Sequence, residues 1–252
     1  MIIDSHCHID FEAFDEDREQ VLSRANRLGI QAIIVPGISA TTWPRVKSVC
    51  QQHTGLYPAY GLHPYFIDQH SVHDLAILEQ WLNDETAVAV GECGLDYYLK
   101  HLDKDKQLHL FEAQLDMALK HHLPLVIHAR KATEQVIQCL KARPGLAGMI
   151  HSYSGSYQQA MQLIDMGFYL SFGGAVTHPR ASRLRHMVSK LPLDALLIET
   201  DAPDQPDVNH QGLRNEPSYI THVIDQISQL KDISRQQLID TTTRNAQLLF
   251  SL

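Results

Sequence analysis

The sequence predicts an α/β fold of the (β/α)8 type, the TIM barrel. Short runs of apolar and β-branched residues alternate with longer amphipathic segments along all 252 residues. Eight such runs can be counted, and eight strand–helix units in about 250 residues is the usual size of this barrel. No G-x-G-x-x-G or P-loop motif follows any run, which argues against a nucleotide-binding doubly wound sheet, the alternative for this pattern.

Most of the predicted strands are near-continuous apolar runs, as expected for parallel strands that are buried on both faces. In chain order, these strands are expected at residues 1–6, 31–36, 56–62, 87–92, 123–128, 148–151, 168–172 and 195–200. No linker or change in composition divides the chain. We therefore expect one TIM-barrel domain over residues 1–252.

Helical patterns lie between the strands, with apolar side chains three and four residues apart. Start signals support them, because a serine is followed three residues later by Asp or Gln before several of these segments. These serines are Ser71, Ser156 and Ser234. Gly29 and Gly167 stand where a helix would end before the next strand.

Composition and charge exclude several classes of protein. The chain is 44% hydrophobic with only 13 Gly and 11 Pro, so it is neither disordered nor collagen-like. Its net charge of −8 argues against a protein that coats nucleic acid through bulk charge. No apolar run reaches the length of a membrane span, no secretory signal begins the chain, and nothing indicates an obligatory protein partner. Four cysteines without a C-x-x-C motif indicate reduced thiols and a cytoplasmic protein.

The sixteen histidines are the unusual feature of the composition. The active site of a barrel lies at the carboxyl ends of its strands, and several predicted strands end in metal-ligand residue types. A single His at a strand end is usually structural, but the joint occurrence indicates a metal site. His6 and His8 are two residues apart and share one face of an extended strand. The candidate ligands are His6, His8, Glu92, His128, His151 and Asp201.

Imidazole and carboxylate donors without Cys suit Zn, Mn, Fe or Ni. Six donors exceed the three that one catalytic zinc needs, so two ions fit better. Glu92 lies on a strand between the two groups of histidines and is the natural bridge. Two such ions activate a water and polarise a carbonyl or phosphoryl oxygen, and Asp201 can take the proton of the attacking water. We therefore expect Asp201 and Glu92 to be catalytic, with two divalent ions of Zn or, alternatively, Mn, Mg or Ni.

Six ordered motifs resemble those of the TatD family of metal-dependent deoxyribonucleases, within the amidohydrolase superfamily. The resemblance extends from residue 3 to about 250, and residues 204–206 and 211–212 are similar to its YjjV-like branch. The motifs are His6-Cys7-His8-Ile9-Asp10, Gly61-Leu62-His63-Pro64, Gly91-Glu92-Cys93-Gly94-Leu95-Asp96-Tyr97, Ile127-His128-Ala129-Arg130, His151-Ser152-Tyr153-Ser154-Gly155 and Glu199-Thr200-Asp201-Ala202-Pro203.

The resemblance implies which ligands share an ion: His6, His8 and Asp201 hold one, His128 and His151 the other, and Glu92 bridges them. It also implies hydrolysis of DNA phosphodiester bonds, trimming strands from an end. A small ester, amide or phosphoester substrate is the alternative, since the superfamily spans such chemistry.

His63 and Arg130 match family positions near the substrate phosphate, and an arginine two residues beyond a ligand suits an anion site. Arg214 could also bind phosphate, or it could belong to a helix entry with Asn215 as the cap and Pro217 in the first turn. Two tyrosines, Tyr97 and Tyr98, could stack on a base or cover the barrel rim. Two further histidines could flank the mouth: His178 and His210.

Overall fold

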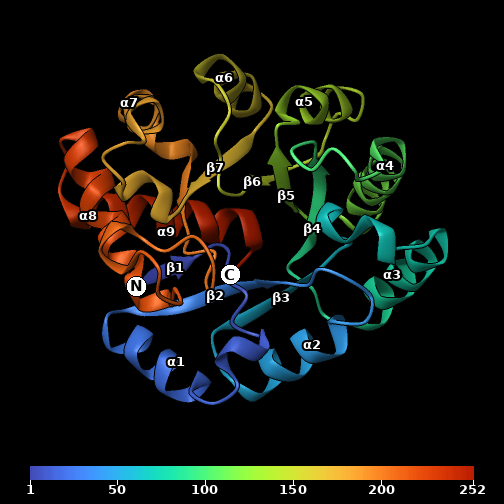
Figure 1. Ribbon diagram of the computed structural model, residues 1–252, viewed down its shortest axis with the longest axis horizontal. Coiled ribbons are helices and arrows are strands. Elements are labelled where there is room, and N and C mark those ends of the chain that lie inside the picture. The colour runs from blue at the N-terminus through green and yellow to red at the C-terminus, as the bar shows by residue number, and fades with distance from the viewer.

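The computed structural model describes residues 1–252 as eight parallel strands in sequential order, with helices outside them (Figure 1). This arrangement confirms the predicted barrel. The strands are β1 (Ile2–Asp4), β2 (Ile30–Pro36), β3 (Leu56–Tyr60), β4 (Ala89–Asp96), β5 (Leu125–Arg130), β6 (Gly148–Ile150), β7 (Phe168–Phe172) and β8 (Leu196–Ile198). The barrel is nearly closed: the Ser5 amide, directly after β1, donates to the Ile198 carbonyl at the end of β8 at 3.0 Å.

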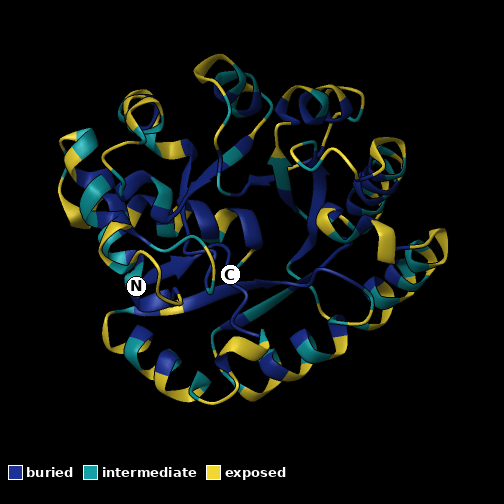
Figure 2. Ribbon diagram, viewed as in Figure 1, coloured by how far each residue is buried: buried dark blue, intermediate teal, exposed yellow.

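Nine α-helices surround the strands, with their outer faces exposed and the strands buried (Figure 2). They are α1 (Arg18–Arg27), α2 (Trp43–Gln52), α3 (Val72–Asp84), α4 (Lys104–His121), α5 (Thr133–Lys141), α6 (Tyr157–Asp165), α7 (Ser182–Lys190), α8 (Ile220–Lys231) and α9 (Arg235–Phe250). No helix has the length and apolar character that would carry it across a membrane.

The predicted helix signals act as expected. Ser156 accepts the Gln159 amide at the start of α6, and Ser234 accepts the Gln237 amide at the start of α9. Gly29 has a φ of +88° just after α1, a conformation that favours glycine. Asn215, in contrast, does not cap a helix. Its side-chain amide donates to the carbonyls of residues 200 and 204 and ties the β8 loop together.

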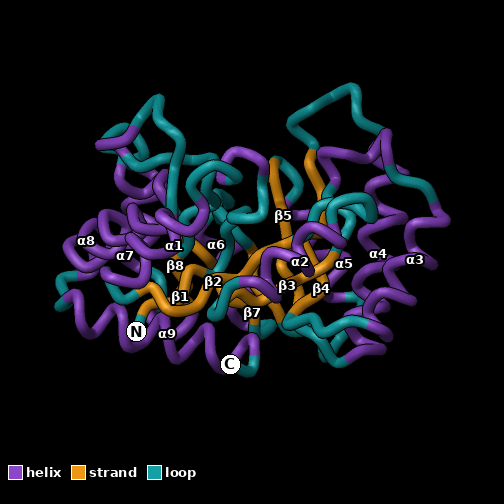
Figure 3. The backbone as a smooth tube through the Cα atoms, turned by 90° about the horizontal axis from the view of Figure 1, so that it is seen from below, coloured by secondary structure: helices purple, strands orange, loops and turns teal.

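Two strands, β4 and β5, extend further at their carboxyl ends than the apolar pattern predicts. The ladder between β4 and β5 continues beyond Glu92, because Gly94 pairs with His128 and Asp96 pairs with Arg130. Seen from the side, β5 rises above most of its neighbours (Figure 3). The polar ends of both strands are therefore held in sheet geometry rather than in free loops.

Side-chain alternation divides the apolar core into two groups. Ile33 and Val35 of β2 face a large cluster beneath the helices, whereas Ala32 and Ile34 belong to a smaller cluster. The smaller cluster also contains Ala246, Leu249 and Phe250, so α9 packs against it. The opposite, carboxyl ends of the strands carry the polar residues described next.

Candidate metal centre

The six predicted ligands meet at the carboxyl ends of their strands. Glu92 lies at the centre and is only 1% exposed. It sits on β4 between the residues of β1 and those of β5 and β6, and each of its two oxygens faces a different set of histidines. The loop after β8 brings Asp201 to the same place.

Oxygen Oε2 of Glu92 faces the two histidines that follow β1. It lies 3.2 Å from His6 Nε2 and 3.4 Å from His8 Nε2. Asp201 Oδ1 adds a second carboxylate at 3.3 Å from the same His6 nitrogen and 3.7 Å from that of His8. Two imidazoles and two carboxylates thus converge on one small volume.

Oxygen Oε1 of Glu92 faces a second set of histidines. It lies 3.0 Å from His151 Nε2 and 3.3 Å from His128 Nδ1. His63 Nε2 approaches the same oxygen at 2.9 Å. His63, predicted to lie near the substrate phosphate, therefore lies directly beside the predicted ligands.

Hydrogen bonds on the outer nitrogens fix the ring tautomers. His8 Nδ1 donates to the Pro36 carbonyl at 3.2 Å, and His128 Nε2 donates to Asp96 Oδ2 at 3.3 Å. Because a neutral imidazole carries one N–H, each ring directs a lone pair inward. The inward nitrogen of His8, Nε2, lies 3.2 Å from His6 Nε2, and that of His128, Nδ1, lies 3.1 Å from His151 Nε2. Imidazole nitrogens and carboxylate oxygens that converge in this way are ligand types of Zn, Mn and Ni, so this donor set fits metal ions.

The electrostatics of the centre also favour positive charge. Burial opposes ionisation of Asp201, but hydrogen bonding and charge from His6 outweigh it and lower the pKa of this carboxyl to about 2. Burial likewise opposes ionisation of Glu92, yet the surrounding histidines hold its pKa well below the usual range. Burial and the charge of His151 lower the pKa of His6, but the two carboxylates raise it overall to about 9. The site therefore stabilises cations.

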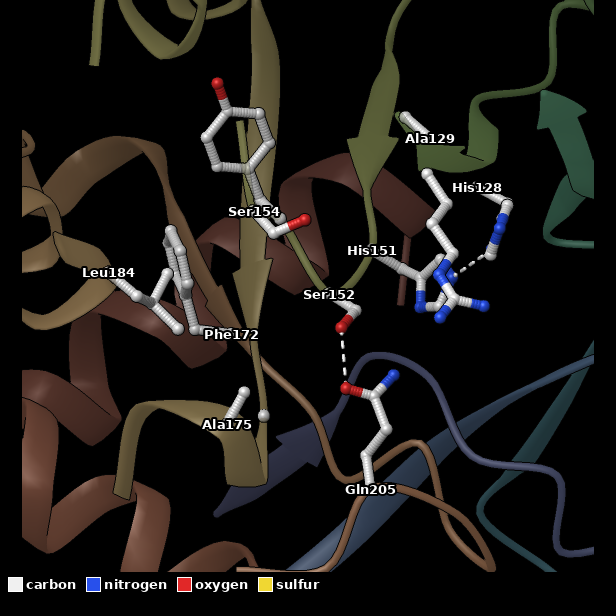
Figure 4. A pocket seen from close by; sticks show the side chains of 12 residues that line it. His128, Ala129, His151, Ser152, Ser154, Phe172, Ala175, Leu184 and Gln205 are labelled. Carbon is white, nitrogen blue, oxygen red and sulfur yellow. Dashed lines mark hydrogen bonds between the residues drawn. The ribbon is translucent and has the colours of Figure 1, made fainter. Parts of the chain in front are cut away.

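A cavity of about 390 Å³ opens beside the histidines of β5 and β6. Figure 4 shows His128 and His151 pointing toward one another at one side, with Ser152 and Gln205 joined by a hydrogen bond below. Arg130 also lines this cavity, and its side chain is exposed. An anionic ligand in the cavity would therefore meet His128, His151 and this guanidinium together.

Comparison with known proteins identifies the family. The model of the family described as TatD related DNase matches residues 3–251. The chain belongs to the TatD family.

The chain is similar to individual TatD-family relatives over its whole length. It is 37% identical to the uncharacterized metal-dependent hydrolase YabD of Bacillus subtilis, covering 100% of both chains. It is also 37% identical to the uncharacterized metal-dependent hydrolase YjjV of Escherichia coli, covering 99% of this chain and 98% of that one. The crystal structure of YjjV superposes with a TM-score of 0.96 at 36% identity, covering 100% and 98% of the two chains. The resemblance to the family and its YjjV-like branch is confirmed, and the protein is a metal-dependent hydrolase.

Two carboxylates of this TatD-family site escaped the sequence prediction. Asp96 receives the outer N–H of His128, and Glu199 lies with Oε1 3.6 Å from His151 Nδ1. Glu199 is fully buried and also accepts the Ser152 amide at 2.6 Å. The alternation of side chains along a strand could have indicated both. Asp96 stands four residues after Glu92, and Glu199 stands two residues before Asp201. Such outer carboxylates orient metal-bound histidines.

A glutamine also supports the site from the loop after β8. Gln205 donates to Asp201 Oδ2 and accepts from Ser152 Oγ at 2.8 Å. Both Asp201 and Ser152 have positive φ, at +56° and +44°, which is uncommon for residues other than glycine and clusters at functional sites. The chain of hydrogen bonds fixes the Asp201 carboxylate in this conformation.

Other residues singled out in the sequence lie outside the site. Arg214 forms a bidentate ion pair with Asp17 at 2.7 and 2.8 Å and does not line the cavity. His178 makes no hydrogen bond to a predicted ligand, and its Nε2 contacts the Pro206 carbonyl at 3.2 Å instead. His210 Nδ1 contacts Asp207 at 2.7 Å. Neither histidine lines the cavity.

Proposed function

We propose that this TatD-family hydrolase is a two-metal deoxyribonuclease that cleaves phosphodiester bonds at DNA ends. The observation that carries the proposal is the position of Glu92, whose two oxygens face two separate sets of histidines. A carboxylate in this position can be shared by two ions. A pair of divalent ions is the usual device for displacement at phosphorus.

The proposed ligands follow from this division. One ion would be held by His6, His8 and Asp201, the other by His128 and His151, with Glu92 shared between them. Such ions, when bound, lower the pKa of a water molecule and polarise a phosphoryl oxygen. The donors are imidazole nitrogens and carboxylate oxygens, without sulfur. Such a set suits Zn, Mn or Ni better than Mg, which prefers oxygen ligands.

The protein's own residues then orient the reactants. The Asp201 carboxylate, ionised at neutral pH and held by Gln205, accepts the proton of the attacking water. Burial lowers the pKa of His63 to about 4, so the ring is neutral. Its Nδ1 accepts the Tyr65 amide, so the proton is on Nε2, which faces Glu92 Oε1 at 2.9 Å. When substrate is bound beside Glu92, this Nε2–H would be donated to a phosphate oxygen instead.

Arg130 supplies the positive charge that a phosphodiester requires. Its guanidinium lies 3.8 Å above the Tyr98 ring, at the edge of the cavity. A planar guanidinium can bind two phosphate oxygens at once. The four cysteines are unpaired, as a reducing compartment leaves them, and we place the enzyme in the cytoplasm.

The test uses 5′- or 3′-end-labelled single-stranded DNA and metal-loaded protein. We expect stepwise shortening of the strand, lost in Asp201→Asn, which keeps the size of the side chain but cannot accept the proton. Intact DNA together with hydrolysis of p-nitrophenyl esters or dipeptides would refute the nuclease proposal. It would favour a small-substrate hydrolase instead.

A further inference from the structure

A groove of about 1,520 Å³ adjoins the cavity of the metal centre. The two share Arg130, Ser154 and Leu184 in their walls, so the groove leads directly from the reacting site. Its other walls come from the beginnings of α5 and α6 and from most of α7. Its volume exceeds the 300–1,000 Å³ typical of a small-ligand pocket, which indicates an extended ligand.

The groove is basic although the protein is acidic. A single acidic residue, Glu134, lines it, against a net charge of −8 for the chain. The positive side chains that line it are Arg130, Lys131, Arg180, Arg183 and Lys190. The amino-terminal turns of α5 and α6 line the groove as well, and the positive ends of their dipoles add to this potential.

These five cations are available to a ligand. All five are exposed, and none forms an ion pair within the protein. Nine other Lys and Arg side chains are paired with carboxylates, for example Arg143 with Asp116 at 2.6 Å. Five cations outside any ion pair thus line a groove that opens into the cavity of the site.

Aromatic side chains are interleaved with the cations. Tyr98 is 53% exposed and Tyr157 is 40% exposed, and both line the groove together with Tyr97. Nucleobases of a single strand can stack on such rings, whereas the bases of a duplex are already stacked on one another. A basic groove with aromatic platforms is the usual surface for single-stranded nucleic acid.

We infer that this groove binds the sugar–phosphate backbone of a single DNA strand on one side of the bond that is cut. The inference rests on the proposed nuclease function and adds to it the path of the substrate. It also resolves the conflict between an acidic protein and an anionic substrate, because the strand meets a local surface of opposite charge.

Salt dependence of binding is the sharpest test. Fluorescence anisotropy would measure binding of a labelled 12-nucleotide strand to the Asp201→Asn protein, which should not cleave it. The same measurement would be made on this protein with Arg183→Gln and Lys190→Gln added. Each phosphate contact with a single strand contributes about 0.7 to the slope of log K against log salt, so losing two contacts flattens the slope by about 1.4. The control combines Arg27→Gln with Lys141→Gln, which removes the same charge outside the groove. We expect its slope to equal that of the parent protein.

Cleavage supplies an independent reading. For this assay the chain keeps Asp201, so that it remains active. The Arg183→Gln, Lys190→Gln variant should lose several-fold in kcat/KM on the 12-nucleotide strand but not on a dinucleotide. The control variant should lose on neither substrate. If wild type shortens DNA but the groove variant matches the control in slope and length dependence, the groove inference is wrong and the nuclease stands. If wild type neither binds nor shortens DNA, the proposed function fails, and the inference with it.

Discussion

Replacing Asp96 by Asn tests how the protein prepares its metal centre. Asp96 is 1% exposed, and its Oδ2 receives the outer N–H of His128 at 3.3 Å while Oδ1 accepts the Tyr98 amide at 2.9 Å. An asparagine can keep the contact with Tyr98, but its amide then presents N–H to the His128 nitrogen. The ring must move or change tautomer, and the tautomer with a proton on Nδ1 has no lone pair for a metal.

The expected loss follows from the number of contacts changed. One oriented histidine is disturbed, and such outer-carboxylate substitutions weaken metal binding by about 10–100-fold. This corresponds to about 1.4–2.7 kcal/mol. The affected ion would be the one that we propose for His128 and His151, whereas the His6 and His8 set keeps its contacts. Competitive titration against a chromogenic chelator, with elemental analysis after dialysis, would resolve a weakened ion from a retained one.

Asp207→Asn is a matched control. Asp207 is also 1% exposed, and its Oδ2 contacts two histidines, His210 at 2.7 Å and His222 at 3.1 Å. It lies outside the proposed centre, so we expect two ions with unchanged affinity. Two tight ions in Asp96→Asn, or equal weakening in both variants, would refute the proposed orientation of His128.

Four further perturbations give predictions. Removing both ions with EDTA should lower the unfolding temperature by about 11–22 °C if each site had been at 100 times its Kd, since each ion then contributes about 2.7 kcal/mol, as calorimetry would show; no change would mean that the folded state holds no ion. His6→Ala should reduce metal content below about two ions per chain, and an unchanged count by elemental analysis would rule out His6 as a ligand. Gly94→Ala should destabilise the fold by about 1–3 kcal/mol in urea unfolding, because φ is +137° and a Cβ would crowd the His128 backbone; equal stability would contradict this. Thr200→Val should cost about 1–3 kcal/mol in the same assay, because it removes a donor to buried Asp4, and a loss below 0.5 kcal/mol would show that this bond matters little.

The sequence was sufficient to predict the barrel because its evidence is local and repeated. Each buried strand is an apolar run, and Ser156, Ser234 and Gly29 mark helix ends through contacts with their own neighbours. The strand ends were less predictable. Residues 93–96 join β4 through pairing with β5, and pairing between distant segments cannot be read from the composition of either.

The gathering of the six candidate ligands was also predictable, since the carboxyl ends of parallel strands meet at one end of a barrel. Their division into two sets about Glu92 was indicated only by the family resemblance, because it depends on side-chain rotamers that no local pattern shows. Arg214 illustrates the same limit: its partner, Asp17, lies 197 residues away in the chain. The roles of His63 and Arg130 toward substrate stay predictions.

Anomalous diffraction from crystals of the metal-loaded protein tests the central claim most directly. We predict two peaks about 3.5–4 Å apart, one against Oε2 of Glu92 beside His6 and His8, the other against Oε1 beside His128 and His151. A single peak, or two peaks that do not share Glu92, would contradict the account.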